Sequence, residues 1–171
     1  MEELDPSKYY ENRLAQLDAL VASGQIESLY PHKFKVTKSL PEFIKTYATN
    51  VKDGETLGDV EERVTGRIML KRASGSKLFF YDLVQDGVKI QIMSQLQSWS
   101  EAEEKSFNLM HSVLRRGDIV GVWGNPGKSK KGELSIMPHG IQLLSPCLWM
   151  LPKVCGLLPL SFIFFKTILC H

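Results

Sequence analysis

The residues of this chain that could do chemistry gather in a stretch of alternating polar and apolar residues. Cations at Arg67, Arg72 and Lys89 accompany an aromatic ring, Phe80, and an amide, Gln91. An aromatic ring can stack an unstacked nucleotide base, an amide offers both a donor and an acceptor to a base edge, and cations hold phosphates. These residue types together predict a surface that binds an unstacked base.

A second group of charges follows near residue 130. It consists of Lys128, Lys130 and Lys131, with Glu133 directly after them. Lysines in a loop are usually just solvated, but a basic cluster near an exposed aromatic ring favours contact with phosphates. A carboxylate can accept a hydrogen bond from a base amino group, although a lone glutamate is more often a surface residue.

No catalytic or metal-binding set is recognisable. The four histidines are scattered, with no nucleophile or carboxylate partner indicated by their spacing. The three cysteines lie late in the chain, form no CxxC pair and indicate a reducing compartment. We therefore expect no catalytic residue, no metal and no cofactor in this chain.

Length and charge limit the function further. The chain has 171 residues, 43% of them hydrophobic, which indicates one globular domain with appendages. Its formal net charge is only +2, so a nucleic-acid site must come from local placement of charge. The N-terminus is acidic and lacks an apolar signal region, which predicts a cytoplasmic protein.

Helical patterns precede the alternating stretch. Asp5 and Pro6 are typical of a helix start, and Gly24 of a helix end. The predicted apolar stripe of this helix is Tyr10, Leu14, Leu17 and Val21. Residues 30–34 are expected to form an extended linker, because the residue before Pro31 favours extended geometry. Ser39 and Glu42 form a capping box for a short second helix.

Five strands are expected between residues 64 and 145. Apolar residues recur at every second position, the pattern of a half-buried strand. The predicted inward residues are Val64, Gly66, Ile68 and Leu70, then Phe79, Tyr81 and Leu83, then Ile90 and Ile92. A capping box of Ser100 and Glu103 begins a helix, and strands over 119–123 and 134–144 follow, joined by a basic loop at 124–132.

This order of elements predicts a mainly β fold with flanking helices. A helix between the third and fourth of five strands is typical of the OB-fold barrel, and the alternative is another small barrel or sandwich. The expected parts are an N-terminal helical segment and linker (1–58), the barrel (59–146) and an apolar tail (147–171). Strand alternation places Phe80 and Gln91 together on the outer face. The alternative is that the N-terminal helix covers Phe80.

Several runs are more specific than a generic barrel pattern. They are DPSKYY (5–10), YPHKF (30–34), GRI (66–68), KRASG (71–75), FYDL (80–83), LRRGDI (114–119), GNPGK (124–128), KGELSI (131–136) and LLSPC (143–147). Through residues 5–153 the chain resembles the N-terminal, anticodon-binding part of eukaryotic cytosolic lysyl-tRNA synthetase, a class II aminoacyl-tRNA synthetase.

The resemblance implies recognition of the U-rich anticodon loop of lysine tRNA. It implies that Phe80 stacks the central uridine, that Gln91 and Arg72 hydrogen-bond it, and that Glu133 contacts a neighbouring base. The resemblance also implies protein partners, because members of the family form homodimers and join a multi-synthetase complex. The implied partners are a full-length synthetase subunit and the scaffold of that complex. ATP and magnesium belong to the catalytic domain of the full-length family, so this chain is expected to be inactive alone.

Two departures accompany the resemblance. The basic extension that animal members carry before Asp5 is missing, so nonspecific tRNA affinity should be weaker. Residues 154–171 resemble nothing in the family, which indicates a shifted reading frame, a retained intron or an alternative last exon. This tail is too short and interrupted for a membrane span. The alternative functions are a protein-interaction fragment and a general single-strand binder.

Overall fold

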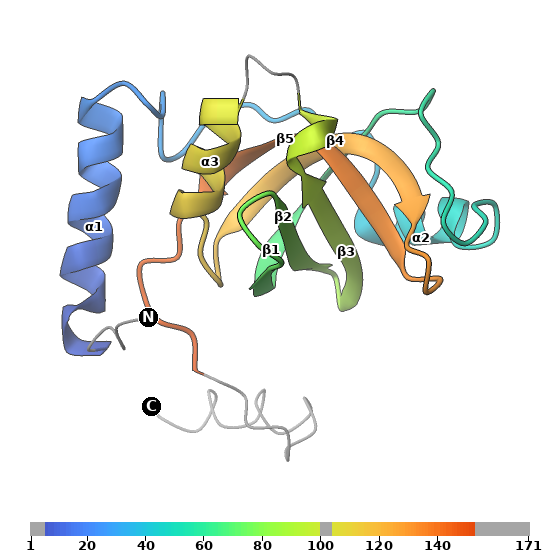
Figure 1. Ribbon diagram of the computed structural model, residues 1–171. Helices are drawn as coiled ribbons and strands as arrows, with labels where there is room; N and C mark the ends of the chain where they lie inside the picture. Colours follow the sequence, from blue (N-terminus) through green and yellow to red (C-terminus); the bar gives the residue numbers. More distant parts are fainter. Residues whose placement is uncertain (1–5, 100–103, 153–171) are drawn as a thin grey trace, which may run out of the picture.

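Five strands close into a barrel in the order β1-β2-β3-β5-β4 (Figure 1). The structure, a computed structural model, describes residues 6–99 and 104–152. The strands are β1 (Glu62–Ala73), β2 (Leu78–Gln85), β3 (Val88–Gln95), β4 (Ile119–Lys128) and β5 (Leu134–Ser145). Neighbours pair antiparallel, except that β3 and β5 are parallel. The predicted OB-fold is confirmed, and the division at residues 59 and 147 stays a prediction.

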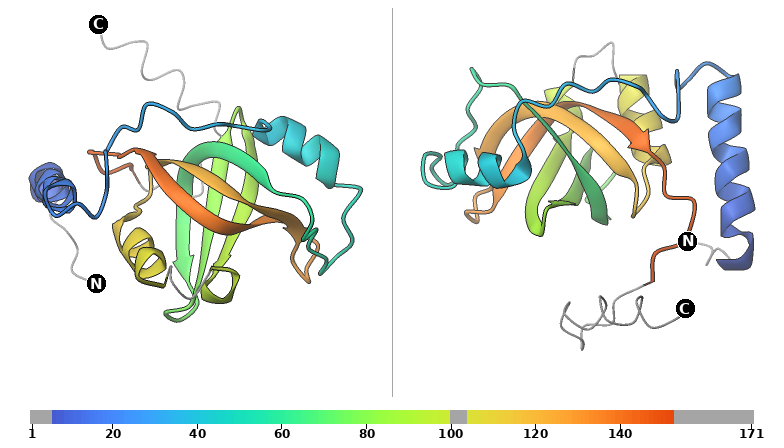
Figure 2. Two further views of the ribbon diagram at one scale, coloured as in Figure 1. Left: turned by 90° about the horizontal axis from the view of Figure 1, so that it is seen from above. Right: turned by 180° about the vertical axis from the view of Figure 1, so that it is seen from behind.

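The helices lie at the two ends of the barrel. They are α1 (Pro6–Ala22), α2 (Leu40–Tyr47), the 3-10 helix η1 (Leu96–Ser98) and α3 (Glu104–Val113). α1 and α3 stand side by side at one end, and α2 lies at the other (Figure 2). The capping box of Ser39 and Glu42 is confirmed. The expected caps at Asp5 and at Ser100 lie outside the described residues, as does the tail from residue 153.

The inward residues of β2 and β3 follow the predicted alternation, but β1 departs from it. Val64 and Ile68 are buried, whereas Leu70 is 41% exposed. A bulge between Ile68 and Leu70 inserts one residue and reverses the phase of the strand. The prediction of an inward Leu70 was therefore wrong. Lys71 points inward instead, and its Nζ donates to the carbonyl of Leu114 just past α3 (3.0 Å).

The fourth strand is longer than expected. Residues 124–128 were predicted to be loop, yet they continue β4 beside β5. Pro126 is tolerated there because β1 pairs with β4 only as far as Gly124, and beyond that point the edge of β4 is met only by an isolated bridge from Thr56 to Gly127. Its carbonyl instead accepts from Leu57 N–H (2.9 Å). The basic loop is thereby shortened to residues 129–133.

A histidine lies inside the barrel end that α3 covers. His111 is 2% exposed, and its two ring nitrogens contact the Tyr81 hydroxyl and the Ser94 hydroxyl (2.9 Å for Ser94). Its ring stacks on Phe79 with centroids 4.3 Å apart. Burial, with a smaller contribution from the Lys71 cation, lowers the pKa of His111 to about 3. This histidine is a satisfied core residue, which its isolated place in the sequence did not reveal.

Acid should therefore weaken the fold through His111. The unfolded chain binds a proton near pH 6.5 and the folded chain only near its lowered pKa of about 3, so stability falls as pH falls between these values. The expected loss is about 1.2 kcal/mol between pH 6 and pH 5. Urea unfolding at both pH values measures it. His111→Gln should flatten this dependence, and an equally steep dependence in that variant would contradict the assignment.

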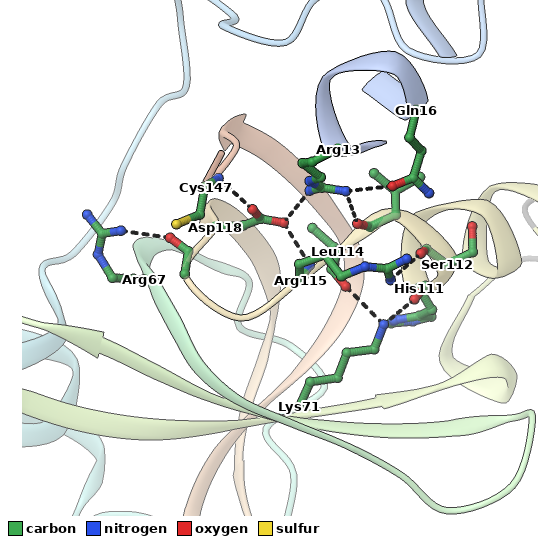
Figure 3. A network of polar contacts seen from close by, with 12 residues as sticks. Arg13, Gln16, Arg67, Lys71, His111, Ser112, Leu114, Arg115, Asp118 and Cys147 are labelled. Carbon is green, nitrogen blue, oxygen red and sulfur yellow. Dashed lines mark hydrogen bonds and ion pairs between the residues drawn. The ribbon is translucent and has the colours of Figure 1, made fainter. Parts of the chain in front are cut away.

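Helix α1 is fastened to the barrel by a buried ion pair. Arg13 Nη2 lies 2.9 Å from Asp118 Oδ2, and Arg13 Nη1 donates to the carbonyl of Val113 (2.9 Å). Figure 3 shows this network between α1, the end of α3 and the start of β4. Within residues 8–22 of α1 the buried side chains are those of Tyr9, Arg13 and Leu17. The predicted stripe is thus confirmed at Leu17, is only half-buried at Tyr10 and Leu14 and is wrong at Val21, which is exposed, because a paired arginine takes a core position.

Candidate nucleic-acid interface

The outer face of β1, β2 and β3 presents one aromatic ring. Phe80 is half-buried and lies between Arg72 of β1 and Met93 of β3 in the strand register. The guanidinium carbon of Arg72 is 5.9 Å from the centroid of the Phe80 ring. The predicted outward position of Phe80 is confirmed. The alternative that the N-terminal helix covers it is wrong, because α1 lies beside α3 at the barrel end (Figure 1).

Gln91 shares this outer face but is not free. It is only 5% exposed, because Ser135 of β5 pairs with it from the side opposite β2. Gln91 Nε2 donates to Glu133 Oε2 (2.8 Å), and the Ser135 hydroxyl donates to Gln91 Oε1 (3.3 Å). The expected placement of Gln91 on the outer face is confirmed. Strand alternation also implied that its side chain is accessible to solvent, and the structure shows that it is buried. A base could use the Gln91 amide only beside, or in exchange for, Glu133.

Asp82 is the site residue that the sequence analysis missed. It lies directly opposite Gln91 and two residues from Phe80 on the same face of β2. Its carboxylate is 3.2 Å from Lys89 Nζ and 3.8 Å from Arg72 Nη2. Strand alternation already placed an acid between two cations here, so the signal to find it was present.

The lysines near residue 130 stand at one end of this face. Lys130 and Lys131 are exposed in the β4–β5 loop, and Lys128 is a half-buried end of β4. Ser129 closes the loop, since its backbone N–H donates to the Glu133 carbonyl (2.9 Å). Because Glu133 contacts Gln91, the loop lies next to the outer face. The structure therefore brings this basic cluster to the aromatic ring's side of the barrel.

Arg67 is the predicted site residue that the structure holds apart. Its Nη1 donates to the carbonyl of Gly117 (2.7 Å), as the close-up view shows (Figure 3). In the register of the strands it lies beside Val84 and Ile119 rather than Phe80. Its guanidinium thus joins β1 to the loop before β4, and a phosphate contact would have to compete with that bond.

The face as a whole combines the parts that a single-stranded base needs. It has a ring for stacking, carboxylate and amide groups for base edges, and cations for phosphates. Within residues 6–99 and 104–152 no three histidine, cysteine or acidic side chains lie close enough to hold a metal ion. In the same ranges no helix has the length and apolar character needed to cross a membrane.

Comparison with known proteins agrees with this geometry. Residues 62–144 match the family of OB-fold nucleic acid binding domains named for the tRNA anticodon. A lysine–tRNA ligase of Cladosporium cladosporioides is 44% identical over 88% of this chain and 25% of its own length. A probable cytoplasmic lysine–tRNA ligase of Enterocytozoon bieneusi is 32% identical over 88% of the chain and 28% of its length. A mitochondrial lysine–tRNA ligase of Schizosaccharomyces pombe is 33% identical over 87% and 29%.

Proposed function

Because the chain belongs to the lysyl-tRNA synthetase family, as an N-terminal anticodon-binding part built on an OB-fold domain, we propose that it binds the anticodon loop of lysine tRNA. The observation that carries the proposal is the Phe80 ring, set outward on the barrel between Arg72 and Met93. A pyrimidine base of the loop stacks on this ring. Lys128, Lys130 and Lys131 contact the phosphates that follow.

The lysines of the β4–β5 loop should change how strongly RNA binding depends on salt concentration, and should not change which RNA sequence is preferred. Replacing Lys130 by alanine removes one exposed cation, so the slope of log K against log salt concentration should become shallower by about 1. Titration of a U-rich anticodon stem-loop between 50 and 200 mM salt measures it. Lys8→Ala, an exposed lysine of α1, is the matched control and should leave the slope unchanged. Equal slopes in the parent chain and both variants would show that Lys130 of the β4–β5 loop does not contact the RNA phosphates.

Ligation of lysine to tRNA requires more than this chain provides in our proposal. The chain spans about a quarter of the length of the curated relatives it matches. We propose that it supplies anticodon recognition and that ATP-dependent ligation, with magnesium, needs the remaining part of such a protein. Charging of lysine tRNA by the purified chain alone would overturn this division of roles.

A second candidate function is contact with another protein. It is favoured by Trp149, which is 68% exposed and stacks on Tyr10 of α1 with centroids 5.0 Å apart. A scaffold of a synthetase complex or a full-length synthetase subunit would cover this ring. Co-purification that is lost in Trp149→Ala and kept in Phe80→Ala would support it, and the reverse pattern would exclude it.

The cellular location is proposed on the resemblance of the chain's motifs to cytosolic members of the family. The Enterocytozoon relative is named as cytoplasmic and the Schizosaccharomyces relative as mitochondrial. Imaging of the tagged chain should show it in the cytoplasm. Accumulation in mitochondria would contradict this location.

A further inference from the structure

Asp82 is a carboxylate between two cations of the outer face, Arg72, which lies at the Phe80 ring, and Lys89, which lies further along the β2–β3 hairpin. It sits on the middle strand β2, with Arg72 reaching it from β1 (3.8 Å) and Lys89 from β3 (3.2 Å). We propose that Asp82 is a positioning residue that sets base specificity. It holds Arg72 beside the ring and Lys89 on the same outer face, and it keeps both cations from binding RNA phosphates regardless of sequence. This inference rests on the proposed function.

The exposure of the three side chains indicates what Asp82 restrains. The side chains of Arg72 and Lys89 are 55% and 53% exposed, whereas that of Asp82 is 13% exposed. Both cations therefore have water on their outer sides and could reach phosphates if they were released. With Asp82 between them, the three residues carry a net charge of +1 instead of +2. The phosphate attraction of this face is thereby reduced at the place where a base must be read.

The hydrogen bonds of Asp82 do not indicate a role in stabilising the fold. Its Oδ1 is shielded from solvent, yet it has no hydrogen-bond donor among the described residues. A buried carboxylate oxygen without a donor costs stability rather than adding to it. The Arg72 guanidinium beside it makes an ion pair at 3.8 Å without a hydrogen bond. The carboxylate thus acts on Arg72 by charge, and on Lys89 by charge and by the exposed hydrogen bond that Lys89 Nζ donates to Asp82 Oδ2 (3.2 Å).

Arg72 also lies over the ring that a base would use. Its guanidinium carbon is 5.9 Å from the centroid of Phe80. A base that stacks on this ring displaces the guanidinium sideways, and Asp82 keeps it at the edge of the base. There its N–H groups can donate to a ring carbonyl oxygen, which uracil carries at two positions. Without Asp82 the guanidinium is free to follow a phosphate instead.

The test compares Asp82→Asn with the parent chain on two probes, an anticodon stem-loop with UUU and the same stem-loop with AAA. Loss of the charge should raise affinity for the AAA loop about fivefold and change affinity for the UUU loop less than twofold. The salt dependence should become steeper by about 1 to 2 as the freed cations contact phosphates. Asp86→Asn is the matched control, because it removes the same charge from the exposed turn of the same hairpin. Asp82→Glu should restore discrimination.

The outcomes separate this inference from the proposed function. An unchanged UUU-to-AAA ratio in Asp82→Asn would overturn the role of Asp82, even where Phe80→Ala still weakens binding. A Phe80→Ala variant that binds as the parent does would instead overturn the proposed function. The unfolding midpoint of Asp82→Asn should equal that of Asp86→Asn. A much lower midpoint would show that Asp82 serves the fold.

Discussion

Replacement of Asp118 by alanine is expected to lower the free energy of unfolding by about 3–5 kcal/mol, since one partner of a buried ion pair is removed and the other stays buried. Asp118 is fully buried and Arg13 is 3% exposed. Asp118 also accepts from the backbone N–H groups of Arg115 and Cys147, both at 2.7 Å. The variant therefore leaves two backbone donors without an acceptor and the buried Arg13 cation without its carboxylate, although Arg13 Nη1 keeps its bond to the Val113 carbonyl. Burial raises the pKa of Asp118, and the Arg13 cation opposes that rise.

Urea unfolding followed by circular dichroism measures the loss. Asp59→Ala, an exposed aspartate of the segment before β1, should change stability by less than about 0.5 kcal/mol. The double variant Arg13→Met with Asp118→Leu should recover only part of the lost stability, because an apolar pair can replace a buried ion pair while the two backbone donors stay unpaired. A loss below about 1 kcal/mol in Asp118→Ala would show that the pair does not hold α1 to the barrel.

Replacement of Phe80 by alanine is expected to weaken binding of the U-rich anticodon stem-loop by about 1–3 kcal/mol, roughly a 5- to 150-fold rise in Kd. The loss arises because the outer face then lacks the ring on which a base stacks. Phe80 is half-buried rather than part of the barrel core, so the variant should fold. Fluorescence anisotropy with a labelled stem-loop measures the change.

Two further variants separate stacking from simple apolar contact. Phe80→Tyr keeps an aromatic face and should bind within about twofold of the parent chain. Phe80→Leu keeps apolar bulk without the ring and should lose most of what the alanine variant loses. Equal binding by the leucine variant and the parent would show that the ring serves only as apolar surface.

Much of the barrel could be predicted because local patterns determine it. The alternation over β2 and β3 correctly placed Tyr81, Leu83, Ile90 and Ile92 inside and Phe80 outside. The phase of β1 could not be predicted in the same way. A bulge adds one residue without interrupting the alternation of polar and apolar residues in the sequence. The sequence pattern therefore gives no sign that Leu70 faces outward and Lys71 inward.

The remaining errors share a different cause, which is a partner far away in the chain. Arg13 takes a core position because Asp118 and Val113 meet it, and Gln91 is covered because β5 returns beside β3. A polar residue in one segment gives no sign of such a partner. The contact of Gln91 with Glu133 belongs to the same class, since the family resemblance implied a base partner for each residue and no contact between them.

The central claim is that a pyrimidine base stacks on the Phe80 ring. It is tested most directly by irradiating the chain in complex with an anticodon stem-loop that carries 5-iodouridine at the central anticodon position. Tandem mass spectrometry of the tryptic digest then locates the covalent bond. The predicted result is a crosslink to Phe80 within the peptide 78–89. Crosslinks confined to other peptides, such as those of the β4–β5 loop, would contradict the claim.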